Sequence, residues 1–175
     1  MNEAVSERLS APDPMTAAQA AAAQAFRAAR GVAPFGPFVP LLHHPDVMTR
    51  LDALGRQLRY EGTLPDDVRE IVVLTTAVAW AQAVEWSIHA PIARAAGCTA
   101  ATLAAIEAGA EPDAPDHQRA AWAFADALHR TRDVSDAVFD RSVAAFGAGG
   151  AVELAALCGY YATLAMIMNM ARTAH

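Results

Sequence analysis

Glutamate and histidine side chains in the middle of the chain are of the types that transfer protons. Glu85 and His89 stand four residues apart, which places them on one face of a helix. Glu70 begins a run of residues that carries no charge before Glu85, so we expect its carboxylate to be at least partly buried. A histidine with carboxylate neighbours in an apolar setting can exchange protons near neutral pH. These residues predict an acid–base site, although the same spacing also fits an ordinary helical pair and a helix-start acid.

The composition argues against several other kinds of chemistry. All 13 basic residues are arginine, so the chain has no lysine for a Schiff base or a phosphate-binding loop. A formal net charge of −6 without a basic cluster argues against nucleic-acid binding. Cys98 and Cys158 form no CxxC pair and have no histidine at zinc-site spacing. Glu85 and His89 lack an evident third ligand as well, so we expect no metal.

The apolar segments favour buried helices over membrane spans. The N-terminus shows no basic region followed by an apolar core and a cleavage site, and we expect a cytoplasmic protein. The longest uncharged apolar stretch, residues 154–168, is shorter than the roughly 18–20 residues that a spanning helix needs. Apolar residues make up 54% of the chain, which is high for a soluble monomer. We therefore expect a homo-oligomer without membrane contact.

Helical spacing, caps and stop signals predict an all-α protein, since no stretch shows sustained period-two alternation with hairpin turns. We expect a loose arm over residues 1–15 and a single helical domain over residues 16–175. Residues 31–47 hold four prolines and should form an ordered loop rather than a regular helix. The helix that begins near residue 66 is apolar on all sides and should lie at the centre of the core. The predicted helices span about 16–30, 46–60, 66–80, 84–96, 99–108, 116–131, 136–146 and 151–172.

Four separated segments carry a recognisable pattern. The first reads L-P-x-x-x-R-E, and the second reads V-E-W-x-x-H-x-x-x-A-x-x-x-G. The apolar stretch VELAALCGYYATLAMIMNM near the C-terminus and the loop PFGPFVPLLHHPDV near the start accompany them. Together, over about residues 34–170, they resemble the carboxymuconolactone decarboxylase family, which includes the alkylhydroperoxidase D-like proteins, and within it the subgroup with E-W-x-x-H. The matching positions are Leu64, Pro65, Arg69, Glu70, Val84, Glu85, Trp86, His89, Ala93 and Gly97.

The resemblance implies an alkylhydroperoxidase D-like helical fold around an antiparallel helix pair, assembled as a trimer or hexamer. In the redox-active branch of that family, the second helix begins C-x-x-C-x-x-x-H and a glutamate lies on the helix before it. Aligned on His89, the two cysteine positions fall on Gln82 and Glu85, and the glutamate falls on Glu70. Thiol–disulfide chemistry needs a thiolate and a resolving partner. The loss of both cysteines therefore argues against peroxidase activity by the family's mechanism.

With peroxidase chemistry disfavoured, the resemblance implies acid–base chemistry without a cofactor. The decarboxylase branch also lacks the cysteine pair and keeps the histidine. Its reaction removes CO₂ from an unsaturated lactone acid and leaves an extended enolate that is protonated at carbon. We expect an enzyme of this kind that decarboxylates or isomerises a small unsaturated oxo-acid or lactone. His89 would donate or shuttle the proton, Glu70 would be its partner, and Glu85 would tune or orient the imidazole.

Five further residues are candidates for contact with the substrate: Gln82, Trp86, Phe38, Tyr161 and Arg69. Gln82 occupies a lost cysteine position and could donate a hydrogen bond, although a helix-start role explains it too. The aromatic rings could form a pocket wall or belong to the core. Arg69, like Arg59, could bind a substrate carboxylate through its guanidinium fork. A solvated face explains either arginine equally well.

Two other kinds of function stay open from the sequence. One is a redox enzyme with a non-standard thiol, such as Cys98 acting with an external thiol. The other is a non-catalytic helical oligomer that binds a small ligand. Replacement of the cysteines separates the first from an acid–base enzyme, and ligand binding without turnover would support the second.

Overall fold

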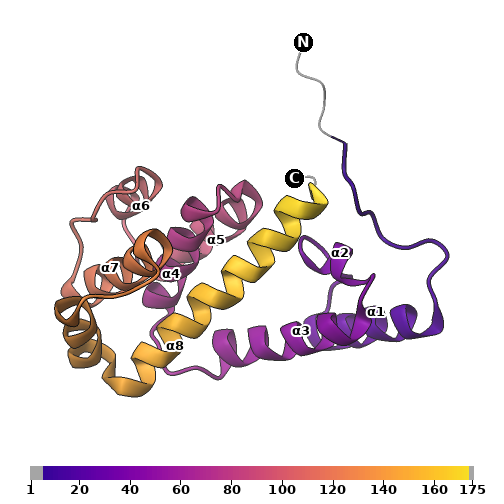
Figure 1. The fold of residues 1–175 in the computed structure, drawn as a ribbon, viewed down its shortest axis with the longest axis horizontal. Helices are drawn as coiled ribbons and strands as arrows, with labels where there is room; N and C mark the ends of the chain where they lie inside the picture. The colour runs from indigo at the N-terminus through magenta and orange to yellow at the C-terminus, as the bar shows by residue number, and fades with distance from the viewer. Residues whose placement is uncertain (1–5, 174–175) are drawn as a thin grey trace, which may run out of the picture.

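The protein is all-α, as predicted. The computed structural model describes residues 6–173, which form eight α-helices and contain no strand (Figure 1). The helices are α1 (Ala17–Arg30), α2 (Phe38–Leu41), α3 (Pro45–Tyr60), α4 (Asp66–Ala79), α5 (Ala83–Ala95), α6 (Ala100–Glu107), α7 (Asp116–Thr131) and α8 (Asp136–Ala171).

Local signals in the sequence set most of the helix boundaries. Thr16 and Gln19 form a reciprocal capping box at the start of α1. Gly31 ends that helix in the left-handed region, at a φ of 77°, where glycine carries no steric penalty. Thr99 and Ser135 accept hydrogen bonds from backbone N–H groups at the starts of α6 and α8. These boundaries agree with the prediction to within one or two residues.

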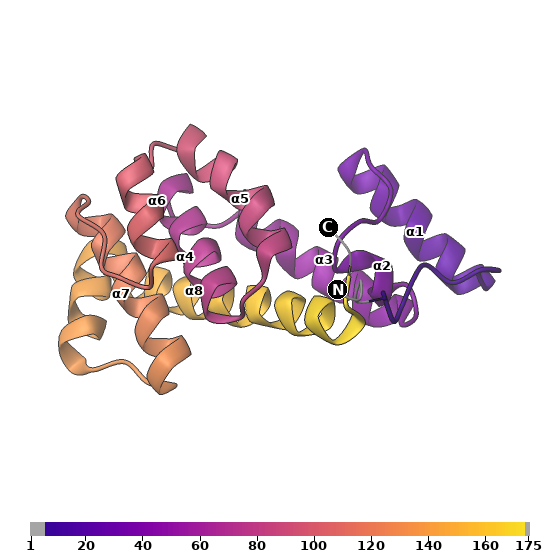
Figure 2. The ribbon, with the colours of Figure 1, turned by 90° about the horizontal axis from the view of Figure 1, so that it is seen from above.

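Helix α4 is the centre of the fold, as its uniformly apolar sequence predicts. It contacts α5, α6, α7 and α8, and every residue from Val68 to Ala77 is buried. The turn after α4 reverses the chain, so that α5 returns against it as the second member of an antiparallel pair. Figure 1 shows this pair beside the long α8 helix, and Figure 2 shows α1 standing apart from it beyond α3. Residues on α4 can therefore face sites on different sides of the molecule.

The helix prediction was wrong in one place and differed in extent in another. The proline-rich loop contains one helical turn, α2, with Pro37 before it and Pro40 inside it. In so short a helix every position belongs to the first turn, where a missing backbone N–H removes no helical hydrogen bond. The predicted break between the last two helices is present, but it is shorter than the predicted gap over residues 147–150. It is a kink inside α8 at Gly147, whose φ of 73° and ψ of 172° are not helical.

The N-terminal arm is tied to the C-terminal end of α8. The backbone N–H of Arg8 donates to the carbonyl of Ala171 at 2.8 Å, and its guanidinium donates to the carbonyl of Met170 at 3.3 Å. His43 contacts the carbonyl of Ser10 at 2.9 Å. Residues 6–15 of the predicted arm form no helix or strand and are mostly exposed, with these few contacts to the rest of the chain. The first five residues of the arm lie outside the described part of the chain.

Helix α8 is the longest and one of the most apolar helices of the described chain. By length and composition alone it could cross a membrane. However, 56% of its most apolar 18-residue window is buried inside the protein, and the helix contacts α2, α3, α4 and α7. Such burial is typical of the core helix of a globular fold.

Candidate active site

Glu70, Glu85 and His89 form one buried cluster. Glu70 lies on α4, one helical turn after the acidic start, and the other two lie on one face of α5. The imidazole Nδ1 of His89 lies 2.6 Å from Oε2 of Glu70, and its Nε2 lies 3.3 Å from Oε2 of Glu85. All three side chains are at most 7% exposed. Each ring nitrogen thus has its own carboxylate, one from each helix of the antiparallel pair.

A cavity of about 210 Å³ opens beside this cluster. His89 and Glu85 line it, whereas Glu70 does not, so Glu70 holds the imidazole from behind. The Nε2 side of the ring is the side that a bound molecule can reach together with Glu85. The remaining lining residues are Arg30, Phe35, Pro37, Phe38, Arg59, Tyr60, Ile88, Ile92, Tyr160, Tyr161 and Leu164.

Arg59 brings a positive charge to the cluster. Its Nη2 lies 3.4 Å from Oε1 of Glu70, and its Nη1 donates to the hydroxyl of Tyr161 at 2.8 Å. Nη1 also lies 3.4 Å from Nδ1 of His89, but that nitrogen gives its hydrogen to the much closer Glu70. With Arg59 and a protonated imidazole, the two carboxylates have two balancing positive charges. Burial alone would lower the pKa of the guanidinium, but Tyr161 and Glu70 outweigh burial, and Arg59 stays cationic.

The surroundings of His89 favour the imidazolium form. Burial alone would lower the pKa of the ring, because a charged group loses its hydration. Hydrogen bonds to Glu70 and Glu85 and their negative charges outweigh burial, so the pKa of His89 lies above its ordinary value of 6.5. A protonated ring close to neutral pH can deliver a proton to a molecule in the cavity.

The far side of the cavity holds polar groups that sequence analysis did not select. Arg30 donates through Nε to Asp52 at 2.6 Å. Its guanidinium lies over the ring of Phe38 at 5.1 Å, and among the described residues its terminal amino groups have no hydrogen-bond partner. Tyr160 is 4% exposed, and its hydroxyl also lacks a partner in residues 6–173. That hydroxyl fits against α3 because Gly55 has no side chain there.

The structure brings some predicted substrate-contact residues to the cavity and not others. Phe38 and Tyr161 line it, and Tyr161 meets the imidazole edge-on at a centroid distance of 5.3 Å. Gln82 instead caps the start of α5 and donates to Asn169 on α8 at 2.8 Å. Trp86 lines a separate hollow together with Gln82. Gln82 is held toward the end of α8 by Asn169, whereas Trp86 faces a hollow that residues of α4 and α6 also line.

Arg69 does not line the cavity beside His89 but a neighbouring hollow, which it shares with Arg59 and Glu70. Its guanidinium pairs with Asp66 and donates to the carbonyl of Leu64 at 3.3 Å. The expected carboxylate-binding arginine is therefore not at the cavity, and Arg30 and Arg59 occupy it instead. From the sequence, a role for Arg59 in binding a carboxylate and a position on a solvated surface were equally good explanations. Arg30 ends a surface-like alanine-rich helix, and nothing in its local sequence marks it as a site residue.

The thiols lie outside the cavity. Cys98 and Cys158 are both buried and free, and neither lines the cavity beside His89. Burial raises the pKa of Cys98 to about 11, with the carboxylates of Asp67 and Glu70 adding to the shift. Burial also raises the pKa of Cys158 to about 12. Both side chains are therefore protonated thiols near neutral pH, which are poor nucleophiles.

Comparison with known proteins agrees with the arrangement of the helices. The sequence model of the carboxymuconolactone decarboxylase family matches residues 45–127, the segment that holds Glu70, Glu85 and His89. A crystal structure described as an alkylhydroperoxidase AhpD core, an uncharacterized peroxidase-related protein from Ralstonia eutropha JMP134, is similar over 96% of this chain and 91% of its own, at a TM-score of 0.76 and 21% identity. Residues 45–127 thus resemble the carboxymuconolactone decarboxylase family, and the chain as a whole shares the fold of the AhpD core structure.

A second solved structure shares the fold at a lower sequence identity. A cysteine-to-alanine variant of the debrominase Bmp8, solved in complex with 2,3,4-tribromopyrrole, is similar over 99% of this chain and 93% of its own. Its TM-score is 0.74 at 15% identity. A search of curated proteins found no match. At these identities the solved structures show the shared fold, and the chemistry has to be argued from the side chains of the chain itself.

Proposed function

We propose that this protein is a cofactor-independent acid–base enzyme that decarboxylates or isomerises a small unsaturated oxo-acid or lactone. The observation that carries the proposal is the buried imidazole of His89, with a carboxylate at each ring nitrogen and one edge on a cavity. Glu70 fixes the ring from behind, so Nε2 faces the cavity beside Glu85. This arrangement supports proton transfer to or from carbon.

The arginines of the cavity suggest how an acid substrate would be oriented. The free amino groups of Arg30 would bind a carboxylate or a lactone oxygen. The hydroxyl of Tyr160 would donate a further hydrogen bond, because burial raises its pKa to about 12 and keeps it protonated. The charge of Arg59 would favour the negative charge that develops on the substrate. A ligand held at this end presents its carbon framework to His89.

Each step of the decarboxylation balances without an oxidant. The bond between the substrate carbon and its carboxylate breaks, CO₂ leaves, and the electron pair remains in the carbon framework as an enolate. The imidazolium of His89 then gives the proton on Nε2 to carbon and regains one from water. In an isomerisation, Glu85 or neutral His89 would first remove a proton from carbon, and the imidazolium would return it at another carbon.

The decisive experiment uses deuterium in place of a known substrate. Candidate unsaturated oxo-acids and lactones are incubated with the protein in D₂O, and NMR follows deuterium entering carbon positions of the product. We expect enzyme-dependent labelling of at least one acid. His89→Asn should lower its rate by about 10²–10⁴-fold, as is typical of a lost general acid or base. His44→Asn, an exposed histidine outside the cavity, should match the unmodified protein.

Glu70 provides a second check on the same machinery. Glu70→Gln should also slow labelling, because the amide cannot stabilise the imidazolium as the carboxylate does. If Glu70 and His89 act as a unit, the loss in the double variant is smaller than the product of the single losses. A His89→Asn protein that melts at a lower temperature but labels at the full rate would show that the histidine is merely structural.

The thiols should be dispensable for this activity. Cys98 and Cys158 are buried, protonated and outside the cavity, so a Cys98→Ser, Cys158→Ser double variant should keep most of its labelling rate. Some loss of stability is expected where Cys158 packs in the core. Complete loss of activity in a folded double variant would instead support a redox enzyme with a non-standard thiol arrangement.

A further inference from the structure

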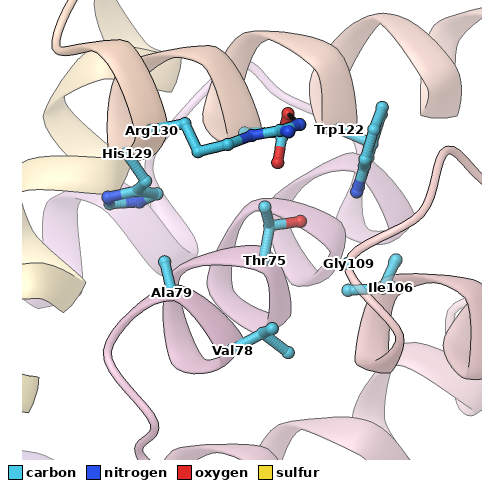
Figure 3. A pocket seen from close by; sticks show the side chains of 9 residues that line it. Thr75, Val78, Ala79, Ile106, Gly109, Trp122, His129 and Arg130 are labelled. Atoms are coloured by element: carbon cyan, nitrogen blue, oxygen red, sulfur yellow. Dashed lines mark hydrogen bonds and ion pairs between the residues drawn. The ribbon is translucent and has the colours of Figure 1, made fainter.

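A second cavity lies on another side of α4, between α4, α6 and α7 (Figure 3). Its volume is about 280 Å³, and it shares no lining residue with the cavity beside His89. Its walls are mostly apolar, from Val78, Ala79, Ile106 and the ring of Trp122, and its polar side chains are those of Thr75, Asp126, His129 and Arg130. Nothing in the proposed acid–base chemistry uses this space.

The indole of Trp122 is the most informative group in this cavity. The residue is only 7% exposed, and in Figure 3 its ring nitrogen points into the space above Thr75. No residue in the described range 6–173 accepts a hydrogen bond from that nitrogen. The nitrogen is not enclosed, because among residues 6–173 the only fully buried side-chain nitrogen or oxygen without a partner is Oγ1 of Thr173. The indole N–H can therefore donate a hydrogen bond to an acceptor atom that enters the cavity.

Acceptors for a hydroxyl hydrogen lie on the same walls. Asp126 stands four residues after Trp122 on α7, so both side chains lie on one helix face. Thr75 gives its own hydroxyl hydrogen to the carbonyl of Ile71 at 2.7 Å, and its oxygen keeps free lone pairs. A single hydroxyl group can thus accept from Trp122 and donate to Asp126 or Thr75.

The cavity carries little net charge. Asp126 pairs with Arg130 one helical turn further on α7. His129 contacts the hydroxyl of Thr76 at 2.8 Å, and burial lowers its pKa despite the nearby Asp126 charge. A neutral imidazole and a paired arginine leave no unbalanced charge to attract an ionic ligand. An uncharged molecule is the better match.

The volume and the walls set the size of the ligand. A dry apolar cavity of about 150 Å³ is enough to bind benzene, so about 280 Å³ accommodates one substituted ring. We propose that the cavity between α4, α6 and α7 binds a small, uncharged hydroxy-aromatic molecule, whose ring packs on Val78 and Ile106 and whose hydroxyl accepts a hydrogen bond from Trp122. The site is separate from the proposed catalytic cavity, and the proposal does not depend on the function assigned there.

Phenol is the simplest probe of this site. In ¹H–¹⁵N NMR spectra, the chain gives three indole signals, from Trp80, Trp86 and Trp122, which single Trp→Phe variants assign. Phenol should shift the Trp122 signal and leave the other two nearly unchanged. Toluene, which has the same ring but no hydroxyl, should bind several-fold more weakly. Trp122→Phe should weaken phenol binding by about tenfold, which corresponds to the loss of one typical hydrogen bond.

A pair of matched variants tests the location. Ala79→Leu places a larger side chain at the cavity from an exposed helical position, so the protein should fold normally. It should abolish the phenol-induced shift of the Trp122 signal. Ala104→Leu makes the same change at an exposed position of α6 that does not line the cavity. This control variant should bind phenol like the unmodified protein.

Three outcomes would overturn the proposal. The first is a Trp122 signal that does not respond to phenol at tens of millimolar. The second is phenol binding that survives in Ala79→Leu and shifts the His89 ring, which would place the ligand in the other cavity. The third is a Trp122 signal that moves with protein concentration alone while Ala79→Leu reduces the sedimentation coefficient. That result would show that a second copy of the chain covers the cavity.

Discussion

At the residue scale, His89 differs from an ordinary core histidine in what meets its two nitrogens. A helical pair accounts for Glu85, which is four residues away on the same helix. It does not account for Glu70, which comes from α4 and makes the shorter contact, 2.6 Å against 3.3 Å. A buried ring between two carboxylates costs desolvation of three groups, and Arg59 offsets part of it. Such a costly arrangement at the edge of a cavity is typical of functional sites.

The charge state of His89 gives a direct prediction. Since Glu70 and Glu85 raise its pKa above 6.5 against the effect of burial, its ring signals in NMR should titrate with a midpoint above 6.5. His129, whose pKa burial lowers, should titrate below 6.5 in the same spectra. In Glu70→Gln the midpoint of His89 should fall. A midpoint for His89 below that of His129 would contradict the electrostatic picture of the site.

The same shift links the site to stability. A histidine with a raised folded-state pKa binds its proton more tightly when folded than when unfolded. The stabilisation from His89 should therefore be complete below about pH 6.5, the ordinary pKa, and should be lost as the pH rises through the folded-state value. The free energy of unfolding, measured by urea denaturation from pH 5 to 9, should decline with pH more in the unmodified protein than in His89→Asn.

The sequence predicted the acid–base residues of the site better than it predicted the residues that line the cavity. Resemblance placed Glu70 near His89, a contact that spacing within one helix cannot give. Arg30 and Tyr160 reach the cavity from α1 and α8, and contacts between distant helices leave no local pattern. Gln82 was expected to meet the substrate, but its hydrogen bond to Asn169 holds it elsewhere. The direction of the Gln82 side chain depends on how the start of α5 packs against α8, which the local sequence does not determine.

At the element scale, the helices were predictable because their signals are local. Caps such as Thr16 and Thr99 and the stop at Gly31 act within a few residues of their own position. The break inside α8 was predictable in the same way, because three of the four residues 147–150 are glycine. Its extent was not predictable, since only Gly147 departs from helical geometry. Burial of Gly150 against Phe146 and Leu64 holds the rest.

Two glycines of this segment make a matched test of the kink. Gly147 has a φ of 73° and a ψ of 172°, a region that is essentially open to glycine alone, so Gly147→Ala should destabilise the protein by about 1–3 kcal/mol. Gly149 lies within α8 at a negative φ and has open space around an added methyl group. Gly149→Ala should stabilise the helix by about 0.5–1 kcal/mol. Urea denaturation of both variants gives the two values.

The opposite signs expected for two exposed glycines make the result specific. If this surface segment simply tolerated alanine, the two substitutions would change the free energy of unfolding by similar, small amounts. Stabilisation by Gly147→Ala would contradict the kink, because it would mean that α8 passes through residue 147 as a regular helix.

At the scale of the whole molecule, α8 leaves an uncharged stripe uncovered. Its exposed side chains recur at helical spacing, so they share one face. Val152 is 71% exposed, Met166 47% and Met170 51%, which is unusual for large apolar side chains in one row. Between them, Gly159 lets another backbone approach closely, because no atom lies within 4 Å of where a side chain would start. This stripe supports the expectation that the chain forms a homo-oligomer.

Sedimentation velocity at micromolar concentration should therefore show an assembly, with a trimer or a hexamer as the expected species. Gly159→Arg should reduce its size, because a charged side chain would enter the apolar contact while arginine itself favours the helix over glycine. Ala104→Arg puts the same charge on an exposed position of α6, away from the stripe, and should leave the assembly intact. Equal dissociation by both variants would point to a general effect of charge. A single species of 18.4 kDa for the unmodified protein would rule out the assembly, and the stripe on α8 would then need another explanation.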